Sequence, residues 1–274
     1  MVTAVWGWTF VLVKDAVTQY PTLPFLQIRF ALALLVMVAL VHRLPTRREL
    51  RLGLIVGGVL AAGYLSQTAG LTMTSPGNAG LITGLFVVFT PLLNRIFGAR
   101  IRWWTWVAVA VSLGGLVMLT GGPSGMGAGD VLVLACAVLF ALHIVLLGRW
   151  SPGMPAAPLA MVQMAACTVI FSAGGTWSVR PPGGAVWFAI VVTGVFASAL
   201  AFYIQTWTQA FISPNRTALI LATEPAWALV AAVVLAGQRF GAVQAAGAAL
   251  VLAAIVGHEL ASVKFEPHGE PSPP

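Results

Sequence analysis

Two stretches of this chain decide its fold, because the second resembles the first. "SQTAGLTMTSPGNAGLI" occupies residues 66–82, and "IQTWTQAFISPNRTALI" occupies residues 204–220. At this offset of 138 residues, Gln67 meets Gln205, and the dipeptides Gln-Thr and Ser-Pro stand at the same places in both stretches. Polar pairs at identical spacing predict that the second half of the chain repeats the first.

The composition indicates a membrane protein. Of 274 residues, 59% are hydrophobic and 8% are charged, whereas roughly a quarter of a soluble domain is charged. Apolar runs of about 20 residues, the length that a helix needs to cross a bilayer, recur along the chain. We therefore predict an all-α integral membrane protein in contact with lipid. The net charge of +7 then indicates basic cytoplasmic loops rather than nucleic-acid binding.

Charged, Pro-rich and Gly-rich breaks divide the chain into ten predicted transmembrane helices. They are residues 2–17, 24–42, 50–71, 77–97, 103–120, 129–149, 158–177, 185–209, 214–236 and 240–259. The remaining segment, 260–274, ends in a polar, Pro-rich sequence and is predicted to be a disordered tail.

The basic residues predict the orientation of these helices. With both termini in the cytoplasm, ten Lys and Arg residues fall on the cytoplasmic side and three on the outer side. Most of this difference comes from residues 42–51 and 95–102. An excess of positive charge marks the cytoplasmic side, so we expect a multi-pass protein of the plasma membrane, which in a bacterium is the inner membrane.

The repeat predicts how the helices are arranged. The two similar stretches fall in the third and fourth predicted helices and in the eighth and ninth, so one repeat is five helices long. An odd number of crossings turns the second repeat upside down. We expect repeats at residues 1–120 and 129–259, around a central cavity. Inverted repeats are typical of secondary transporters, which bind substrate near the middle of the membrane between the repeats.

Four stretches are similar to the EamA-type transporters of the drug/metabolite transporter superfamily. They are "WGWTFVLVKDA" at 6–16, "PFLQIRFALA" at 24–33, "GLTMTSPGNAGLITGLFVVFTPLL" at 70–93 and "AFISPNRTALILATEPAWALV" at 210–230. The resemblance covers essentially the whole chain. It implies ten helices in two inverted halves, and transport of small metabolites, often export of amino acids or related compounds. One departure is Gln238 in "GQRF", where the family often has Glu.

Glu224 is the sharpest candidate for a functional group. It lies in an apolar run, "ALILATEPAWALV" at 218–230, where a charge costs on the order of 2.5–3.5 kcal/mol. It could bind a proton or a substrate amine in the cavity, or hydrogen-bond a neighbouring helix as a neutral acid. Pro225 would free a backbone carbonyl and is a candidate hinge. His143 could relay protons or join two helices.

Aromatic and uncharged polar residues complete the predicted cavity. Trp6 and Phe10 share a helix face at spacing i and i+4, as do Tyr203 and Trp207, so two stacking walls are expected. The alternative for the tryptophans is anchoring at the membrane surface. Asn78 is a further candidate for the cavity lining, although such residues often only link helices.

We therefore expect a transporter of a small-molecule substrate, with an exporter of amino acids or related compounds as the first interpretation and a multidrug or lipophilic-cation exporter as the second. A lipid-modifying membrane enzyme is a remote alternative, because the seven acidic residues are scattered rather than clustered. Cys136 and Cys167 lie in apolar runs, and no CxxC or His/Cys cluster occurs, so neither a metal nor another cofactor is expected. The sequence does not indicate an oligomeric state.

Overall fold

The described residues of this computed structural model, 2–98, 102–120, 126–174 and 181–265, form helices joined by short loops and contain no strand. The helices are α1 (Val2–Gln19), α2 (Thr22–Leu40), α3 (Arg47–Met73), α4 (Pro76–Thr83), α5 (Phe86–Asn94), η1 (Arg95–Phe97), α6 (Trp103–Thr120), α7 (Ala128–Trp150), α8 (Ala156–Ser172), α9 (Gly184–Val191), η3 (Val192–Leu200), α10 (Ala201–Gln209), α11 (Pro214–Leu221), α12 (Glu224–Val234) and α13 (Ala242–Phe265).

Each of the ten predicted segments overlaps one helix or a run of adjoining helices, and residues 175–177 of the seventh lie outside the described residues. The predicted tail is partly wrong, because α13 continues to Phe265. No Gly or Pro lies between residues 260 and 265, so nothing there ends the helix. The rest of the predicted tail, 266–274, lies outside the described residues.

Five helical runs are long and apolar enough to cross a membrane: Thr22–Leu40, Arg47–Met73, Pro76–Phe97, Ala128–Trp150 and Gly184–Gln209. Four shorter apolar helices accompany them: Trp103–Leu119, Ala156–Ser172, Glu224–Val234 and Ala242–His258. The chain is therefore a multi-pass membrane protein, and helices are its only regular structure in the described residues. Ten separate spans in two inverted repeats remain a prediction.

Two of the predicted spans are interrupted at corresponding positions. The fourth is broken between α4 and α5, at Gly84 and Leu85, and the ninth between α11 and α12, at Ala222 and Thr223. These breaks are 138 residues apart, the same offset that relates the two similar stretches of sequence. The sequence suggested that Pro225 interrupts a continuous helix, but the structure shows that it does not. It lies in the first turn of α12, where proline costs no hydrogen bond.

The two broken spans cross at positions that have small side chains. A Cβ atom added to Gly84 would meet the ring of Pro225, and one added to Gly80 would meet the Cβ of Ala228. Only glycine allows this approach, since any larger side chain would push α4 away from α12. The first residue of α12, Glu224, is fixed beside this crossing.

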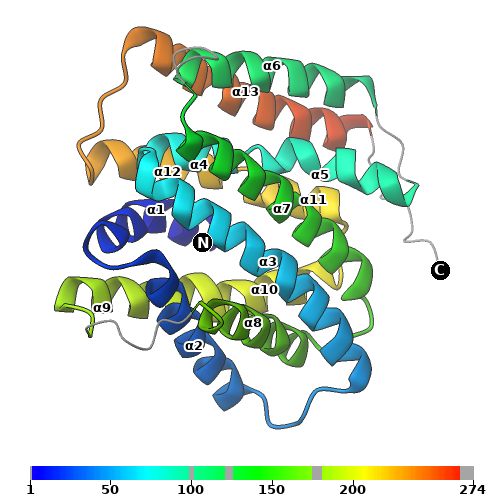
Figure 1. Ribbon diagram of the computed structural model, residues 1–274. Helices are drawn as coiled ribbons and strands as arrows, with labels where there is room; N and C mark the ends of the chain where they lie inside the picture. Colours follow the sequence, from blue (N-terminus) through cyan, green and yellow to red (C-terminus); the bar gives the residue numbers. More distant parts are fainter. Residues whose placement is uncertain (1, 99–101, 121–125, 175–180, 266–274) are drawn as a thin grey trace.

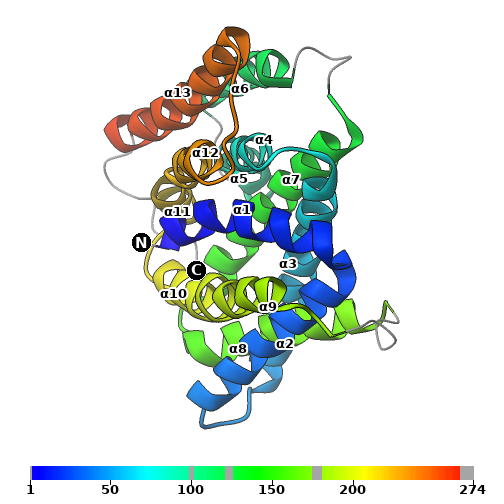
Figure 2. The same cartoon turned by 90° about the vertical axis from the view of Figure 1, so that its left-hand side faces the viewer.

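The helices lie in layers, as Figures 1 and 2 show. Helices α6 and α13 lie side by side along one edge of the bundle, and α2 and α8 lie along the opposite edge. Between these edges, α1 passes between α11–α12 on one side and α9–α10 on the other (Figure 2). Its contacts with α12, α9 and η3 place the first helix of the chain at the centre of the fold.

The start of α3 is held by a dense polar cluster. Thr46 and Glu49 form a capping box: the Thr46 backbone N–H donates to Glu49 Oε2 at 2.7 Å, and the Glu49 backbone N–H donates to Thr46 Oγ1 at 3.3 Å. Arg43 donates to both carboxylate oxygens of Glu49, at 2.6 and 3.0 Å. These bonds satisfy donors that a helix start leaves free.

The segment η3 is π-helical, so its backbone hydrogen bonds join residues five apart instead of the four of an α-helix. It follows α9 and precedes α10 without a break. Such segments are rare and occur frequently at functional sites. Here the carbonyl of Ala197 accepts from Trp6 Nε1 at 2.8 Å, so η3 holds α1 in place.

Candidate functional site

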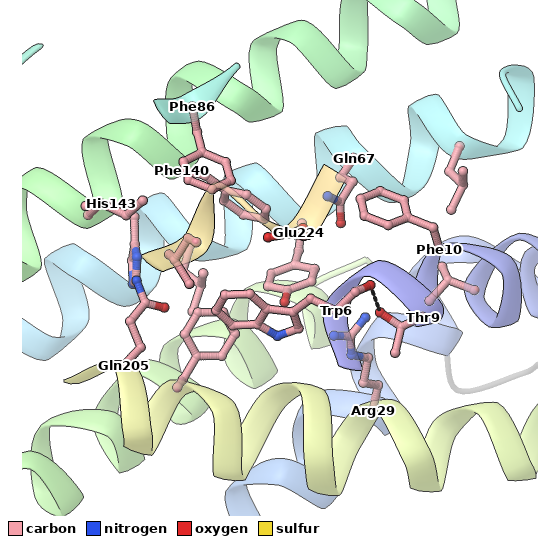
Figure 3. Close-up of a pocket in the computed structure, with 17 residues that line it drawn as sticks. Trp6, Thr9, Phe10, Arg29, Gln67, Phe86, Phe140, His143, Gln205 and Glu224 are labelled. Carbon is pink, nitrogen blue, oxygen red and sulfur yellow. Dashed lines mark hydrogen bonds between the residues drawn. The ribbon is translucent and has the colours of Figure 1, made fainter. Parts of the chain in front are cut away.

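A cavity lies at the centre of the bundle, with its lining contributed by α1, α2, α3, α5, α7, α10, α11 and α12 (Figure 3). The cavity volume is about 40 Å³, which is room for about three water molecules. A metabolite would therefore need the helices to move apart. Its aromatic lining is Trp6, Phe10, Tyr64, Phe86, Phe140 and Phe202, and its polar lining is Thr9, Arg29, Gln67, His143, Gln205 and Glu224.

The aromatic rings pack against one another around the cavity. The Trp6 and Phe202 ring centroids are 5.4 Å apart, and Tyr64 meets Phe202 edge-on at 5.9 Å and Phe140 at 5.3 Å. Trp6 is also fixed by its hydrogen bond to η3, so it is held inside the protein and does not anchor the chain at the membrane surface. These rings form a firm apolar wall for a flat or cationic ligand.

Arg29, on α2, is 2% exposed. Its Nε donates to Ser198 Oγ at 3.0 Å, and its guanidinium carbon lies 4.6 Å from the centre of the Tyr64 ring and 5.3 Å from that of Phe30. No salt bridge to it occurs among the described residues. The arginine is thus a buried cation held by a hydroxyl and by ring faces.

Glu224 is 5% exposed and begins α12 at the broken span. Figure 3 shows its side chain in the middle of the drawn cavity, between Gln67 and Trp6. In the described part of the chain, no hydrogen bond or salt bridge reaches its carboxyl group. The cavity therefore contains an acidic group without a protein partner, at a position 138 residues after Phe86, which also lines it.

His143 has a hydrogen-bond partner within the protein. Its Nε2 lies 2.9 Å from Gln163 Oε1, and Gln163 Nε2 donates to Thr206 Oγ1 at 3.2 Å. The amide oxygen of Gln163 can only accept, so His143 Nε2 carries the proton in this bond. This chain joins α7, α8 and α10, which agrees with the helix-linking alternative for His143. The ring also lines the cavity, edge-on to Phe202 at 5.7 Å.

Gln205 and Gln209 form a second polar chain. Gln209 Nε2 donates to the backbone oxygen of Ile144 at 2.9 Å, and Gln205 Nε2 donates to Gln209 Oε1 at 3.0 Å. Gln205 lines the cavity and is 6% exposed. Its Oε1 has no hydrogen-bond donor among the described residues.

Three predicted lining residues lie elsewhere. Trp207 is 54% exposed and packs on Phe211 with ring centroids 5.6 Å apart, so it faces outward. Tyr203 packs only at the edge of the core, and Asn78 gives its backbone N–H to Ser75 at the start of α4. Neither lines the cavity.

The sequence signal that could have found the missed residues is the repeat itself. At the offset of 138, Tyr64 pairs with Phe202, Gln67 with Gln205 and Phe86 with Glu224, and all six line the cavity. Gln238, the departure noted in the sequence, lies outside it. Its amide bonds Ser75 Oγ at 2.9 Å and the Gly77 N–H at 3.0 Å, where it caps α4.

Metal binding has no visible basis in the part of the chain that the structure describes, because no three His, Cys, Asp or Glu side chains gather there. The polar lining instead offers a carboxyl group, a guanidinium group, two amides and an imidazole. These groups recognise polar organic molecules, and the rings around them suit an apolar portion of the same molecule.

Comparisons with known proteins agree with this picture. The model of the "EamA-like transporter family" matches residues 1–121 and 127–258. An "uncharacterized transporter" of Archaeoglobus fulgidus is 27% identical over 93% of this chain and 82% of its own. The "uncharacterized inner membrane transporter YedA" of Escherichia coli K12 is 25% identical over 92% and 86%. A crystal structure with 21% identity has the same fold, with a TM-score of 0.71 and 96% of both chains covered.

Proposed function

Because the chain belongs to the EamA-like transporter family, we propose that it is a secondary transporter that exports small organic metabolites, amino acids or related compounds, across the plasma membrane. The observation that carries the proposal is Glu224, a buried acidic group in an aromatic cavity, to which no other described residue hydrogen-bonds. Buried charges inside membrane helices usually serve substrate or ion pathways. Glu224 is the proposed proton-coupling and substrate-amine group, and His143 is the second coupling candidate.

The proposed mechanism is alternating access by two inverted five-helix repeats, residues 1–120 and 129–259. Three observations support it: the 138-residue offset of the two helix breaks, the paired lining residues at that offset and the two matches of the family model. In such repeats, broken helices meet at the substrate site near the membrane middle. The break beside Pro225 is the proposed hinge, because the small cavity must widen to admit a metabolite.

The proposed topology has ten spans with both termini in the cytoplasm. It can be tested with single cysteines placed at Lys14, on the predicted outer side, and at Lys264, on the predicted inner side. In intact cells, a thiol reagent that does not cross membranes should label the first and spare the second. The reverse pattern, or labelling of both, would contradict this topology.

The function is tested by measuring the thermal stability of the purified protein against amino acids, other metabolites and cationic drugs. A ligand at about 100 times its dissociation constant should stabilise the native state by roughly 2.7 kcal/mol. Compounds that stabilise are then measured for efflux from cells with and without the protein. If no compound stabilises the protein and efflux of none depends on it, the proposal fails.

A second function is export of lipophilic cations. It is favoured by one specific observation, that Glu224 shares its cavity with six aromatic side chains, since rings and a carboxylate both attract cations. The same panel separates the two. Stabilisation by cationic drugs alone favours this second function, whereas stabilisation by zwitterionic metabolites favours the first.

A further inference from the structure

Gln205 has an acceptor that the protein leaves unused. Its Oε1 has no hydrogen-bond donor in the described part of the chain, although the side chain is 94% buried, being 6% exposed. Buried polar atoms nearly always have a partner. In Figure 3 the amide oxygen of Gln205 points toward the middle of the drawn cavity, on the side where Trp6 lies. The free acceptor therefore points toward the cavity, but the atom is fully buried in this structure, so a ligand can reach it only when the cavity widens.

The orientation of this amide is fixed by the backbone. The carbonyl of Ile144 can only accept, so the Gln209 nitrogen must face it, at 2.9 Å. The Gln209 oxygen then needs a donor, and Gln205 supplies its nitrogen at 3.0 Å. A flipped Gln205 would set two amide oxygens against each other. Gln209 thus acts as a positioning residue that keeps the Gln205 oxygen toward the cavity.

We propose that Gln205 Oε1 accepts a hydrogen bond from an N–H group of the substrate, so that the cavity selects primary ammonium compounds over fully N-methylated ones. This inference rests on the proposed function and specifies its substrate class. A primary ammonium group has three donors, so it can donate to the Gln205 oxygen and still has N–H groups for other acceptors of the cavity. A quaternary ammonium group has no donor, so it can use the carboxylate and the rings but not the amide.

The experiment uses tryptamine and its N,N,N-trimethyl derivative as probes, because both carry one positive charge and the same ring system. Their dissociation constants are measured by isothermal titration of the purified full-length protein in detergent. We expect tryptamine to bind at least tenfold more tightly than the trimethyl compound. In Gln205→Met, which keeps the length of the side chain, the ratio should fall to near one through weaker binding of tryptamine alone.

Two further variants make the result specific. Gln209→Met leaves Gln205 in place but frees its amide to rotate, so the ratio should fall only partly. Gln19→Met, on the exposed end of α1, should leave the ratio unchanged. Because the trimethyl compound is bulkier, the change in the ratio between the protein and Gln205→Met is the decisive quantity, and a steric preference alone would be the same in both.

The inference is overturned if neither probe binds, if the wild-type protein does not prefer tryptamine, or if Gln205→Met keeps the wild-type ratio. These results leave the transport proposal intact, because that proposal is tested by the metabolite panel and efflux. A transported compound without any N–H group that binds equally well to Gln205→Met would likewise refute the role of Gln205 and retain transport.

Discussion

Glu49 and Glu224 are both buried carboxyl groups, at 3% and 5% exposure, but their surroundings are opposite. Glu49, in the first turn of α3 and just before the predicted span 50–71, accepts two hydrogen bonds from Arg43 and one from the Thr46 backbone. Glu224, beside the break between α11 and α12, has none among the described residues. Within the described part of the chain, the first carboxylate therefore has three donors, whereas the second is available to a proton or to the substrate proposed above.

This difference separates structural from functional polarity within the same chain. Removing a group with built partners should cost stability, because those partners lose their bonds. Removing a group without partners should cost transport and leave stability intact. The four predictions below test that separation, beginning with the largest expected effect.

Glu224→Gln should lower the transport rate at least tenfold and abolish its dependence on pH. Glutamine keeps the size of the side chain, but it cannot become charged or release a proton. The measurement is efflux of a compound identified by the stability panel, recorded between pH 5 and 8 as the range in which a coupling group should titrate. The melting temperature is the control and should not fall. Efflux that keeps its wild-type pH dependence would exclude Glu224 as the coupling group.

His143→Leu should destabilise the protein by about 0.6–3 kcal/mol, because Gln163 Oε1 loses its donor in a buried site. Thermal unfolding in detergent measures this. Residual efflux should keep the wild-type pH profile, since the imidazole is bound to Gln163. A changed pH profile would show that His143 takes part in proton coupling, as proposed for Glu224, and is not only a structural link between helices.

Glu49→Gln should cost about 1 kcal/mol, since the lost ion pair lies at the surface on its arginine side. Its hydrogen bonds from Arg43 hold the pKa of Glu49 below its ordinary value of 4.5. The stabilisation by the ionised group is therefore complete above pH 4.5 and is lost as the pH falls through the lowered pKa. Unfolding measured from pH 3 to 6 should show this loss in the wild type and not in the variant. Reduced efflux at neutral pH would contradict a purely structural role.

Thr46→Ala should have the smallest effect, about 0.5 kcal/mol, at the low end for a helix cap. The reason is that its hydroxyl accepts from the Glu49 backbone over a long 3.3 Å, while the other half of the capping box uses the Thr46 backbone and survives. Chemical denaturation compared with Glu49→Gln measures it. A loss larger than that of Glu49→Gln would show that the hydroxyl, and not the carboxylate, holds this helix start.

The helices were predictable from sequence because apolar length and Gly, Pro and charge breaks decide them, and each predicted segment is helical. The rotation of each helix about its own axis, which decides the side chains that face the cavity, was not predictable. Tyr203 and Trp207 were correctly placed on one helix face, but the cavity faces Phe202 and Gln205 instead. The inward face of this helix carries Gln205 and Gln209 at spacing i and i+4, so its polar residues, and not its aromatic pair, mark its rotation. The π-helical η3 just before it shifts the phase further, by about 100° for each residue inserted.

Predictability within the site follows the same division. Glu224 and His143 were placed in the cavity because ionisable groups are unusual in an apolar run, and Trp6 and Phe10 because they share a helix face; all four line it. Tyr64, Phe86, Phe140 and Phe202 were not, since an aromatic residue is ordinary in such a run. The partners of the polar groups were also hidden, because Ser198 is 169 residues from Arg29. No local pattern reports a contact of that range.

The position of α1 against α12 has a consequence for the order in which the core forms during synthesis. Gly7 lies against Trp227 and Ala228, so closely that an added Cβ would be 2.5 Å from that of Trp227. The ribosome synthesises α1 before α12, the helix that packs against it, and about 220 residues separate the two contacts. At ordinary rates of synthesis this takes roughly 10–45 s. Until residue 197 has been made, the Trp6 indole also lacks its acceptor, the Ala197 carbonyl. The last third of the chain thus completes the core that its first helix began.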